Sequence, residues 1–234
     1  MKFTYSIPTK ILFGPGSFND LATTPLPGKK ALVVITAGKS MRANGYLDRL
    51  IDMLDKQGIG HALFDKILPN PVLRHVHEGA ALAREQGCDF VIGLGGGSSA
   101  KSIAVMAKNP GDYWDYISGG SGKGQPLVNG ALPIVAIATT AGTGTEADPW
   151  TVITKEDTNE KIGFGCAETF PVLSVVDPEM MLTIPAHLTA YQGFDALLHA
   201  TEGYIANVAT PLSDAYALKS IELLAKYLPA AVKD

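Results

Sequence analysis

A run of three glycines, Gly95-Gly96-Gly97, followed by Ser98 and Ser99, is the stretch best suited to hold an anion. Three consecutive glycines carry no Cβ atoms, so backbone N–H groups there can close on a negatively charged group. The serines are typical of a helix N-cap, and a helix start adds unpaired amides and its dipole. The stretch therefore predicts a site for a phosphate-bearing ligand. A tight turn between a strand and a helix, without a ligand, is the alternative.

Asp195 and His199 form a second candidate site, in the segment GFDALLHATE. A spacing of four residues places both side chains on one face of a helix, where they could share a divalent metal. Their neighbours are apolar, so we expect neither group on an ordinary solvated face. The alternatives are a buried hydrogen-bonded pair or a surface ion pair. Two ligands alone do not complete a catalytic metal site, which needs about three protein ligands and an open position.

Hydroxyl groups gather in the segment from Thr139 to Thr145, after a predicted buried strand. They suit contacts with ribose, phosphate or amide groups, although a turn that caps a following helix would have the same composition. Lys161 could reach a phosphate or a ribose. A solvated lysine is the alternative for that residue.

The elements that must position these groups alternate between strand and helix. Apolar strands are predicted at 31–36, 61–64, 89–94 and 132–138. Helical spacing of Leu47, Leu50, Ile51 and Leu54 predicts a helix that Gly58 ends, and another helix is predicted over 72–86. This alternation favours an α/β fold with a parallel sheet, whose ligands bind at the carboxyl ends of the strands. Four loops follow such ends, at Gly38–Ser40, Asn70, Gly95–Ser98 and Thr139–Thr143.

The remaining segments divide the chain in two. Residues 1–14 are predicted as an edge hairpin, residues 109–130 as a long irregular excursion, and further strands at 151–154, 161–165 and 173–176. Two helices at 186–207 and 212–227 have no strand between them. The sequence thus predicts an α/β domain over 1–182 and a helical region over 183–234.

The composition excludes several classes of protein. The formal charge is −4, and no basic run is present, which argues against nucleic acid or an anionic membrane as a partner. Cys88 and Cys166 have no metal or redox spacing and suit a reducing compartment. We expect a protein of the cytoplasm, since neither a signal peptide nor a membrane span is predicted.

Three motifs, in this order, resemble the iron-dependent (group III) alcohol dehydrogenases: GLGGGSS at 93–99, ATTAGTGTEAD at 138–148 and LTAYQGFDALLHATEGY at 188–204. PNP at 69–71 and VVDPEMM at 175–181 extend the resemblance over nearly the whole chain. It implies a dinucleotide domain followed by a helical metal-binding domain. The implied reaction is reversible oxidation of a small primary alcohol to its aldehyde with NAD(P), with Fe²⁺ or Zn²⁺ polarising the alcohol oxygen.

The resemblance, together with the strand-end loops, gives a set of expected site residues. Asp195 and His199 correspond to the first two metal ligands, and no catalytic residue is assigned. The cofactor-contacting positions are Gly38, Ser40, Asn70, Gly96, Gly97, Ser98, Thr139, Thr140, Thr143 and Lys161. A glycerol-dehydrogenase-like or dehydroquinate-synthase-like relative is a further possibility on the same fold.

The sequence departs from the family pattern in its histidines. The family completes its metal site with two further histidines, whereas no histidine follows His199. The chain is therefore expected to be a family member cut short in its second domain. The competing hypothesis is a fragment that binds dinucleotide and catalyses nothing. Apolar residues of the last helix, left without a cover, predict a homo-oligomer; they are Leu212, Leu218, Ile221 and Leu224.

Two further departures concern charge near the cofactor. Lys101 and Ala104 stand where the family usually has an acid and a lysine, and Lys101 could help to hold phosphate. In the loop Ala37-Gly38-Lys39-Ser40 no carboxylate is present to repel a 2′-phosphate, so acceptance of NADP(H) is predicted.

Overall fold

The computed structural model describes residues 1–233, and the contacts within the chain divide it into two compact units. The α/β unit consists of Ile7–Ala138 and Thr145–Pro178. The helical unit consists of Met1–Ser6, Thr139–Gly144 and the chain from Glu179 onward. The domain boundary between residues 182 and 183 stays a prediction.

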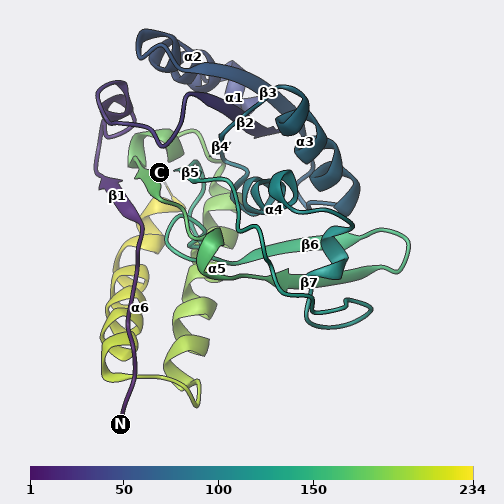
Figure 1. Ribbon diagram of the computed structural model, residues 1–234. Coiled ribbons are helices and arrows are strands. Elements are labelled where there is room, and N and C mark those ends of the chain that lie inside the picture. Colours follow the sequence, from purple (N-terminus) through teal and green to yellow (C-terminus); the bar gives the residue numbers. More distant parts are fainter. Residues whose placement is uncertain (234) are drawn as a thin grey trace. The chain divides into compact units, whose positions relative to one another are not determined.

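The α/β unit is built on a six-stranded parallel sheet, as the sequence predicted (Figure 1). Its strand order is β1-β8-β5-β4-β2-β3. Every residue of β4 and β5 is buried, because helices cover both faces of the sheet and leave these central strands no solvent side. The strands are β1 (Lys10–Phe13), β2 (Lys30–Thr36), β3 (Gly60–Ile67), β4 (Phe90–Leu94), β5 (Ile134–Ala138) and β8 (Leu173–Val176).

The helices of this unit follow from right-handed crossovers between the parallel strands. The step from β2 to β3 runs in one direction along the sheet, and the steps from β3 through β4 to β5 run in the other. The connecting helices therefore lie on opposite faces, α1 and α2 on one and α3 and α4 on the other (Figure 1). The helices are α1 (Ser40–Ala43), α2 (Tyr46–Lys56), α3 (Leu73–Glu85) and α4 (Gly97–Lys108), with short 3₁₀ turns at Asn19–Ala22, Tyr113–Asp115, Ala167–Thr169 and Pro178–Met181.

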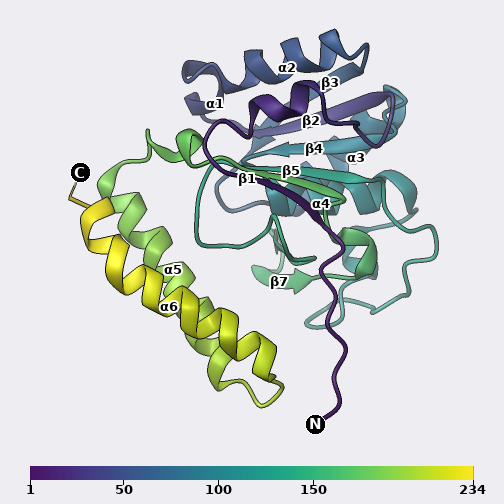
Figure 2. The ribbon, with the colours of Figure 1, turned by 90° about the vertical axis from the view of Figure 1, so that its left-hand side faces the viewer.

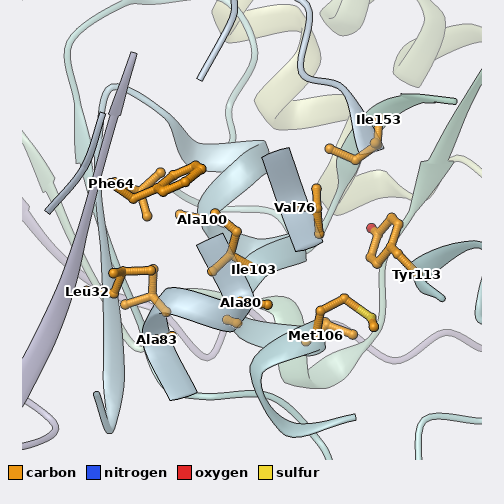
Figure 3. Packing of buried hydrophobic residues seen from close by; sticks show 14 of the residues in the cluster. Leu32, Phe64, Val76, Ala80, Ala83, Ala100, Ile103, Met106, Tyr113 and Ile153 are labelled. Carbon is orange, nitrogen blue, oxygen red and sulfur yellow. The ribbon is translucent and has the colours of Figure 1, made fainter. Parts of the chain in front are cut away.

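A hydrophobic cluster of buried residues lies between the sheet and α3 and α4 (Figure 3). Leu32 and Phe64 from the strands meet Val76 and Ile103 from the helices. The irregular segment 109–130 joins the same cluster, because its aromatic residues are buried there. Tyr113 is fully buried, and burial raises the pKa of its hydroxyl to about 12. The segment is irregular, as predicted, yet its first part is anchored to the core.

The predicted hairpin over residues 1–14 is wrong. Of these residues only Lys10–Phe13 form a strand, which pairs in parallel with β8, Lys10 opposite Leu173. The alternating pattern at the N-terminus indicates an extended chain, but it contains no information about a partner some 160 residues away. Asp177, just after β8, stabilises this pairing by accepting hydrogen bonds from the N–H groups of Gly16 (3.1 Å) and Phe18 (3.0 Å).

Two more strands form a hairpin apart from the main sheet. β6 (Thr151–Lys155) and β7 (Glu160–Phe164) pair antiparallel, and Asn159 takes a left-handed φ of 55° in the turn between them. The sequence predicted both strands.

The helical unit contains the two predicted helices, α5 (Ala186–Ile205) and α6 (Pro211–Ala231), which lie side by side (Figure 2). Gly193 allows this close approach, because a Cβ there would lie 2.2 Å from a methyl group of Leu228. The prediction that an apolar face of α6 lacks a cover is only partly right. Leu218 is exposed, but Leu212, Ile221 and Leu224 are half-buried. Among residues 1–233, no helix is long and apolar enough to cross a membrane.

Candidate functional site

The carboxyl ends of the parallel strands gather the predicted loops at one edge of the sheet. Ala37 follows β2, Leu68 follows β3 and Gly95 follows β4. The chain leaves neighbouring strands β2 and β4 toward opposite faces, so a topological switch point lies between them. Open α/β sheets bind ligands in the crevice outside such a point.

The glycine loop, Gly95–Gly97, allows neighbouring groups to approach the backbone closely. Gly95 has a φ of +73°, which favours glycine, and α4 begins at Gly97. A Cβ on Gly97 would lie 2.4 Å from Cγ2 of Thr145, so only glycine fits without a shift. The first N–H groups of α4 have no partner within the helix and are available to an anion.

The predicted capping role of the serines is wrong. Gly96 occupies the N-cap position of α4, and no side chain caps it. Ser98 lies inside the first turn, where its carbonyl accepts a hydrogen bond from Ser102 Oγ at 3.1 Å. Ser99 is buried, and its hydroxyl has no hydrogen-bond partner among the described residues. The helix starts earlier than expected because glycine itself can occupy the N-cap position.

Asn70 and Lys161 meet, although 91 positions separate them in the chain. The Lys161 ammonium donates to the side-chain oxygen of Asn70 at 3.1 Å. Asn70 comes from the loop after β3, and Lys161 comes from β7. Lys161 is exposed, as the alternative of a solvated lysine expects, and with Asn70 it presents an amide and a positive charge near the carboxyl end of β3.

The loop after β2 is open to solvent. Gly38, Lys39 and Ser40 are all exposed. No carboxylate lies within residues 37–40, and the nearby Arg42 is held by Asp65 at 2.6 Å.

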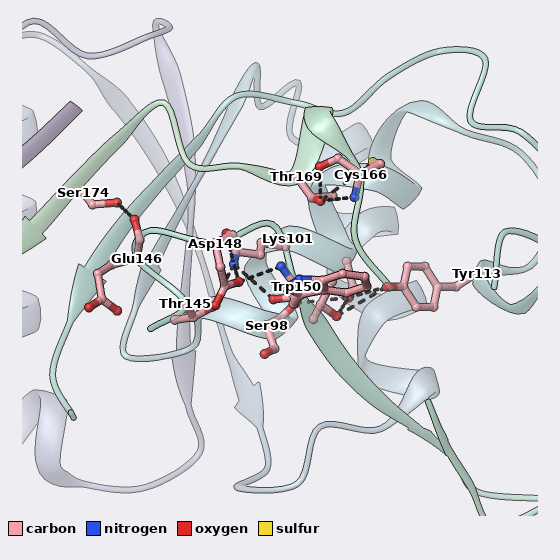
Figure 4. Close-up of polar contacts among 12 residues, drawn as sticks. Ser98, Lys101, Tyr113, Thr145, Glu146, Asp148, Trp150, Cys166, Thr169 and Ser174 are labelled. Carbon is pink, nitrogen blue, oxygen red and sulfur yellow. Dashed lines mark hydrogen bonds and ion pairs between the residues drawn. The ribbon is translucent and has the colours of Figure 1, made fainter. Parts of the chain in front are cut away.

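The prediction that Lys101 could help to hold phosphate is wrong. Its side chain is fully buried, and all of its hydrogen bonds go to protein oxygens of Thr145, Asp148 and Trp150 (Figure 4). Burial lowers the pKa of the Lys101 ammonium, and the opposite charge of Asp148 counteracts this shift. Ala104 is also buried and carries no charge, so neither residue presents a charge to a ligand. Apolar or small neighbours along α4 were the sequence signal for this burial.

The threonine segment belongs to the helical unit, where it packs on α5. The N–H of Ala141 donates to Gln192 Oε1 at 2.9 Å. Gly142 has a φ of +110°, and a Cβ there would lie 2.8 Å from Oδ2 of Asp195. The alternative of a turn that caps a helix is wrong, because no helix follows before β6. Thr139 is buried, whereas Thr140 and Thr143 are exposed.

Asp195 and His199 lie on one face of α5, as predicted, with 3.5 Å between Oδ1 and Nε2. Both are about half exposed, at 45% and 54%, so the expectation that they avoid a solvated face is wrong. The expectation relied on apolar neighbours in the sequence, but Phe194 and Leu198 are themselves exposed. Of the alternatives, the surface ion pair describes the observed contact.

Glu202 completes this group and was missed from the sequence, although its position three residues after His199 was a signal. The His199 Nδ1–H donates to Glu202 Oε1 at 2.8 Å. In a neutral imidazole this leaves the Nε2 lone pair facing the Asp195 carboxylate, an arrangement that suits a cation. A nitrogen and a carboxylate oxygen fit Fe²⁺ or Zn²⁺. Among residues 1–233, no group of three or more His, Cys, Asp or Glu side chains could hold a metal.

Comparison with known proteins gives consistent matches along the chain. Residues 8–178 match the family model described as iron-containing alcohol dehydrogenase, and residues 189–234 match that of the C-terminal part of the same family. A choline dehydrogenase of Bacillus subtilis is 39% identical over 99% of this chain and 58% of its own length. A 1,3-propanediol dehydrogenase of Klebsiella pneumoniae is 37% identical over 98% of this chain and 59% of its own length.

Solved structures agree. The archaeal Red Sea brine pool alcohol dehydrogenase ADH/D1, bound to NZQ, superposes with a TM-score of 0.92 at 34% identity, over all of this chain and 60% of that one. A sulfoacetaldehyde reductase from Bifidobacterium kashiwanohense, in complex with NAD⁺, superposes with a TM-score of 0.87 at 32% identity, over all of this chain and 61% of that one. The chain therefore spans about 60% of the length of these relatives.

Proposed function

The chain belongs to the iron-containing alcohol dehydrogenase family, and from this premise we propose that it binds NAD(P) for hydride exchange with an alcohol. One observation carries the proposal. The glycine loop and Asn70, which accepts a hydrogen bond from Lys161 of β7, lie in the α/β unit at the carboxyl ends of parallel strands, where such sheets bind nucleotides.

Each group has a role in this proposal. The backbone amides of Gly96, Gly97 and Ser98 hold the pyrophosphate, and Lys161, oriented by Asn70, contacts a ribose or phosphate oxygen. Gly38 and Ser40 contact the adenosine end, and the threonine segment, with Thr139, Thr140 and Thr143, contributes hydroxyl groups.

Asp195 and His199 are proposed as two ligands of a divalent metal, Fe²⁺ or Zn²⁺. When bound, such an ion supplies Lewis-acid polarisation of an alcohol oxygen. Glu202 holds the His199 ring so that Nε2 faces the Asp195 carboxylate. Residues 1–233 contain no group of three or more His, Cys, Asp or Glu side chains that could hold a metal, so two ligands are all that we propose from them.

The cofactor is proposed to be either NAD(H) or NADP(H), with the phosphorylated form accepted. Lys39 and Ser40 are exposed at the end of β2, and Arg42 neutralises the nearby Asp65. A 2′-phosphate would meet positive charge and hydroxyl groups there. At least tenfold tighter binding of NADH than of NADPH would contradict this part of the proposal.

The substrate is proposed to be a small primary alcohol or its aldehyde. Relatives named for choline, methanol and 1,3-propanediol share a primary hydroxyl group as the reactive feature. We further propose a homo-oligomer in the cytoplasm, a reducing compartment that suits the two free cysteines, Cys88 and Cys166.

Equilibrium titration of the chain with NADH and NADPH, followed by nucleotide fluorescence, tests the binding. We expect saturable binding that Lys161→Met weakens about tenfold, because it removes one charge-assisted contact. Lys10→Met is the control, since Lys10 begins a parallel strand and so lies at the opposite edge of the sheet. Absence of saturable binding, or equal losses in both variants, would contradict the proposal.

Hydride transfer has its own test, which is aldehyde reduction by the chain with NAD(P)H and added Fe²⁺. Oxidation of the nucleotide in step with aldehyde consumption is expected. Binding without any turnover would favour a chain that holds dinucleotide and catalyses nothing.

A further inference from the structure

A fully buried lysine of the α/β unit, Lys101, connects the helix of the glycine loop to the segment Thr145–Trp150. The Lys101 ammonium donates to Thr145 Oγ1 at 2.9 Å, to the Asp148 carbonyl at 2.7 Å and to its carboxylate at 3.1 Å (Figure 4). It also lies 3.1 Å from the carbonyl of Trp150. An ammonium has three donors, so these four acceptors use all of them.

These contacts fasten one segment to one helix. Lys101 lies on α4, one turn after the glycine loop, and its acceptors all lie in the segment Thr145–Trp150. The same segment presses Thr145 against Gly97, where no Cβ could fit. Ser102 adds a second tie at the end of the segment, since its hydroxyl lies 2.6 Å from that of Thr151.

Two consequences follow if the ammonium is lost. The Asp148 carboxylate, which also accepts from the Trp150 N–H at 2.6 Å, and two carbonyl groups would lose their shared donor. These acceptors are part-buried, and acceptors that lose their donor gain by turning toward water, so the segment would move away from α4. Thr145 would then no longer hold Gly97, and the glycine loop would become more mobile.

We propose that Lys101 is a positioning residue for the dinucleotide, which fixes the Thr145–Trp150 segment against the first turn of α4 and so holds the glycine loop ready for pyrophosphate. The ammonium does not itself touch the ligand, because it is fully buried and its donors are used. Binding to a preformed loop is tighter because less freedom is lost on binding. This inference rests on the proposed function, since it presumes a pyrophosphate at the loop.

The test uses Lys101→Met, which keeps the length of the side chain and removes its charge. Lys108→Met is the matched control, the same change at an exposed position of the same helix. Titrations with ADP and with adenosine separate the pyrophosphate contact from the rest of the nucleotide. We expect Lys101→Met to bind ADP and NADH about tenfold more weakly, with adenosine changed less than twofold. Amide hydrogen exchange at 95–98 and 145–150 should be faster in this variant only.

Loss of affinity for ADP and adenosine alike would indicate a general structural role and overturn the proposal. Unchanged ADP binding in folded Lys101→Met would overturn it as well, while leaving the proposed function intact. If wild-type protein binds neither ADP nor NADH, the proposed function fails and this inference falls with it. Should Lys101→Met not fold, Asp148→Asn and Thr145→Val provide the same measurement, and a selective loss for ADP in both is then required.

Discussion

At the end of β2, Lys39 is exposed in a loop without a carboxylate, and its charge would lie beside the adenosine ribose. We expect Lys39→Glu to weaken NADPH binding at least tenfold more than NADH binding, because a carboxylate repels a 2′-phosphate and accepts from a 2′-hydroxyl. Parallel titrations with the two nucleotides measure this. Lys56→Glu, an exposed position on α2, controls for a general charge effect. Equal losses for both nucleotides would show that Lys39 does not face the 2′ position.

Glu202 lies beside the proposed metal ligand His199. Its carboxylate fixes His199 by a 2.8 Å hydrogen bond to Nδ1. We expect Glu202→Gln to lower Zn²⁺ affinity by about tenfold, since partners of ligating histidines typically contribute that much. Calorimetric titration measures the affinity, and Glu222→Gln, which breaks only the surface pair with Lys219, is the control. Identical affinities in the two variants would contradict the role of Glu202.

Among the elements, α4 depends on close approach at its first residue. We expect Gly97→Ala to destabilise the fold by about 1–3 kcal/mol, because the new Cβ would lie 2.4 Å from Thr145 Cγ2. Gly203→Ala in α5 is the opposite case, since a Cβ there meets nothing within 4 Å. It should stabilise that helix by about 0.5–1 kcal/mol. Urea unfolding of both variants measures the change in unfolding free energy, which should be a loss for Gly97→Ala and a gain for Gly203→Ala. A Gly97→Ala variant more stable than wild type would contradict the packing described.

The β6–β7 hairpin has a pH-dependent contact. Glu160 accepts hydrogen bonds from the N–H (2.6 Å) and hydroxyl of Ser121 and from the Thr158 hydroxyl (2.7 Å), which lower the pKa of its carboxyl from 4.5 to about 2. Because the folded pKa is lower than the unfolded one, this stabilisation is present above pH 4.5 and is lost as the pH falls toward 2.

The difference in unfolding free energy between wild type and Glu160→Gln should therefore be largest near pH 6 and shrink steadily below pH 4.5. Urea titrations at several pH values measure it. A difference that grows on acidification would contradict this sign. Glu156→Gln, at the nearby surface pair with Arg74, is the control.

Most elements were predictable because their signals are local. Leu47, Leu50 and Leu54 repeat at helical spacing, and the buried strands are unbroken apolar runs. The predictions that were wrong concern residues whose surroundings come from parts of the chain distant in sequence. The pairing of Lys10 with Leu173 is non-local, and the exposure of Asp195 is decided by what covers α5 rather than by its neighbours in sequence. The Lys101 contacts likewise required knowledge of where residues 145–150 return to α4.

For the molecule as a whole, both helices of the helical unit expose apolar stripes. Tyr191, Phe194, Leu198 and Ile205 recur on one face of α5, and Tyr216, Leu223 and Tyr227 recur on one face of α6. Exposed stripes of this kind favour association. We expect light scattering to show self-association that the double variant Leu223→Glu, Tyr227→Glu reduces. A monomeric wild type at the same concentration would contradict the proposed homo-oligomer.

We propose that the α/β unit holds NAD(P) at the carboxyl edge of its sheet, at the switch point between β2 and β4. Hydrogen exchange of the wild-type chain with and without saturating NADH tests it most directly, because each amide reports its own protection. We expect slower exchange at residues 95–99 when NADH is bound, with smaller effects at 37–40 and 68–70. Unchanged exchange at 95–99 under saturating nucleotide, with protection elsewhere, would contradict it.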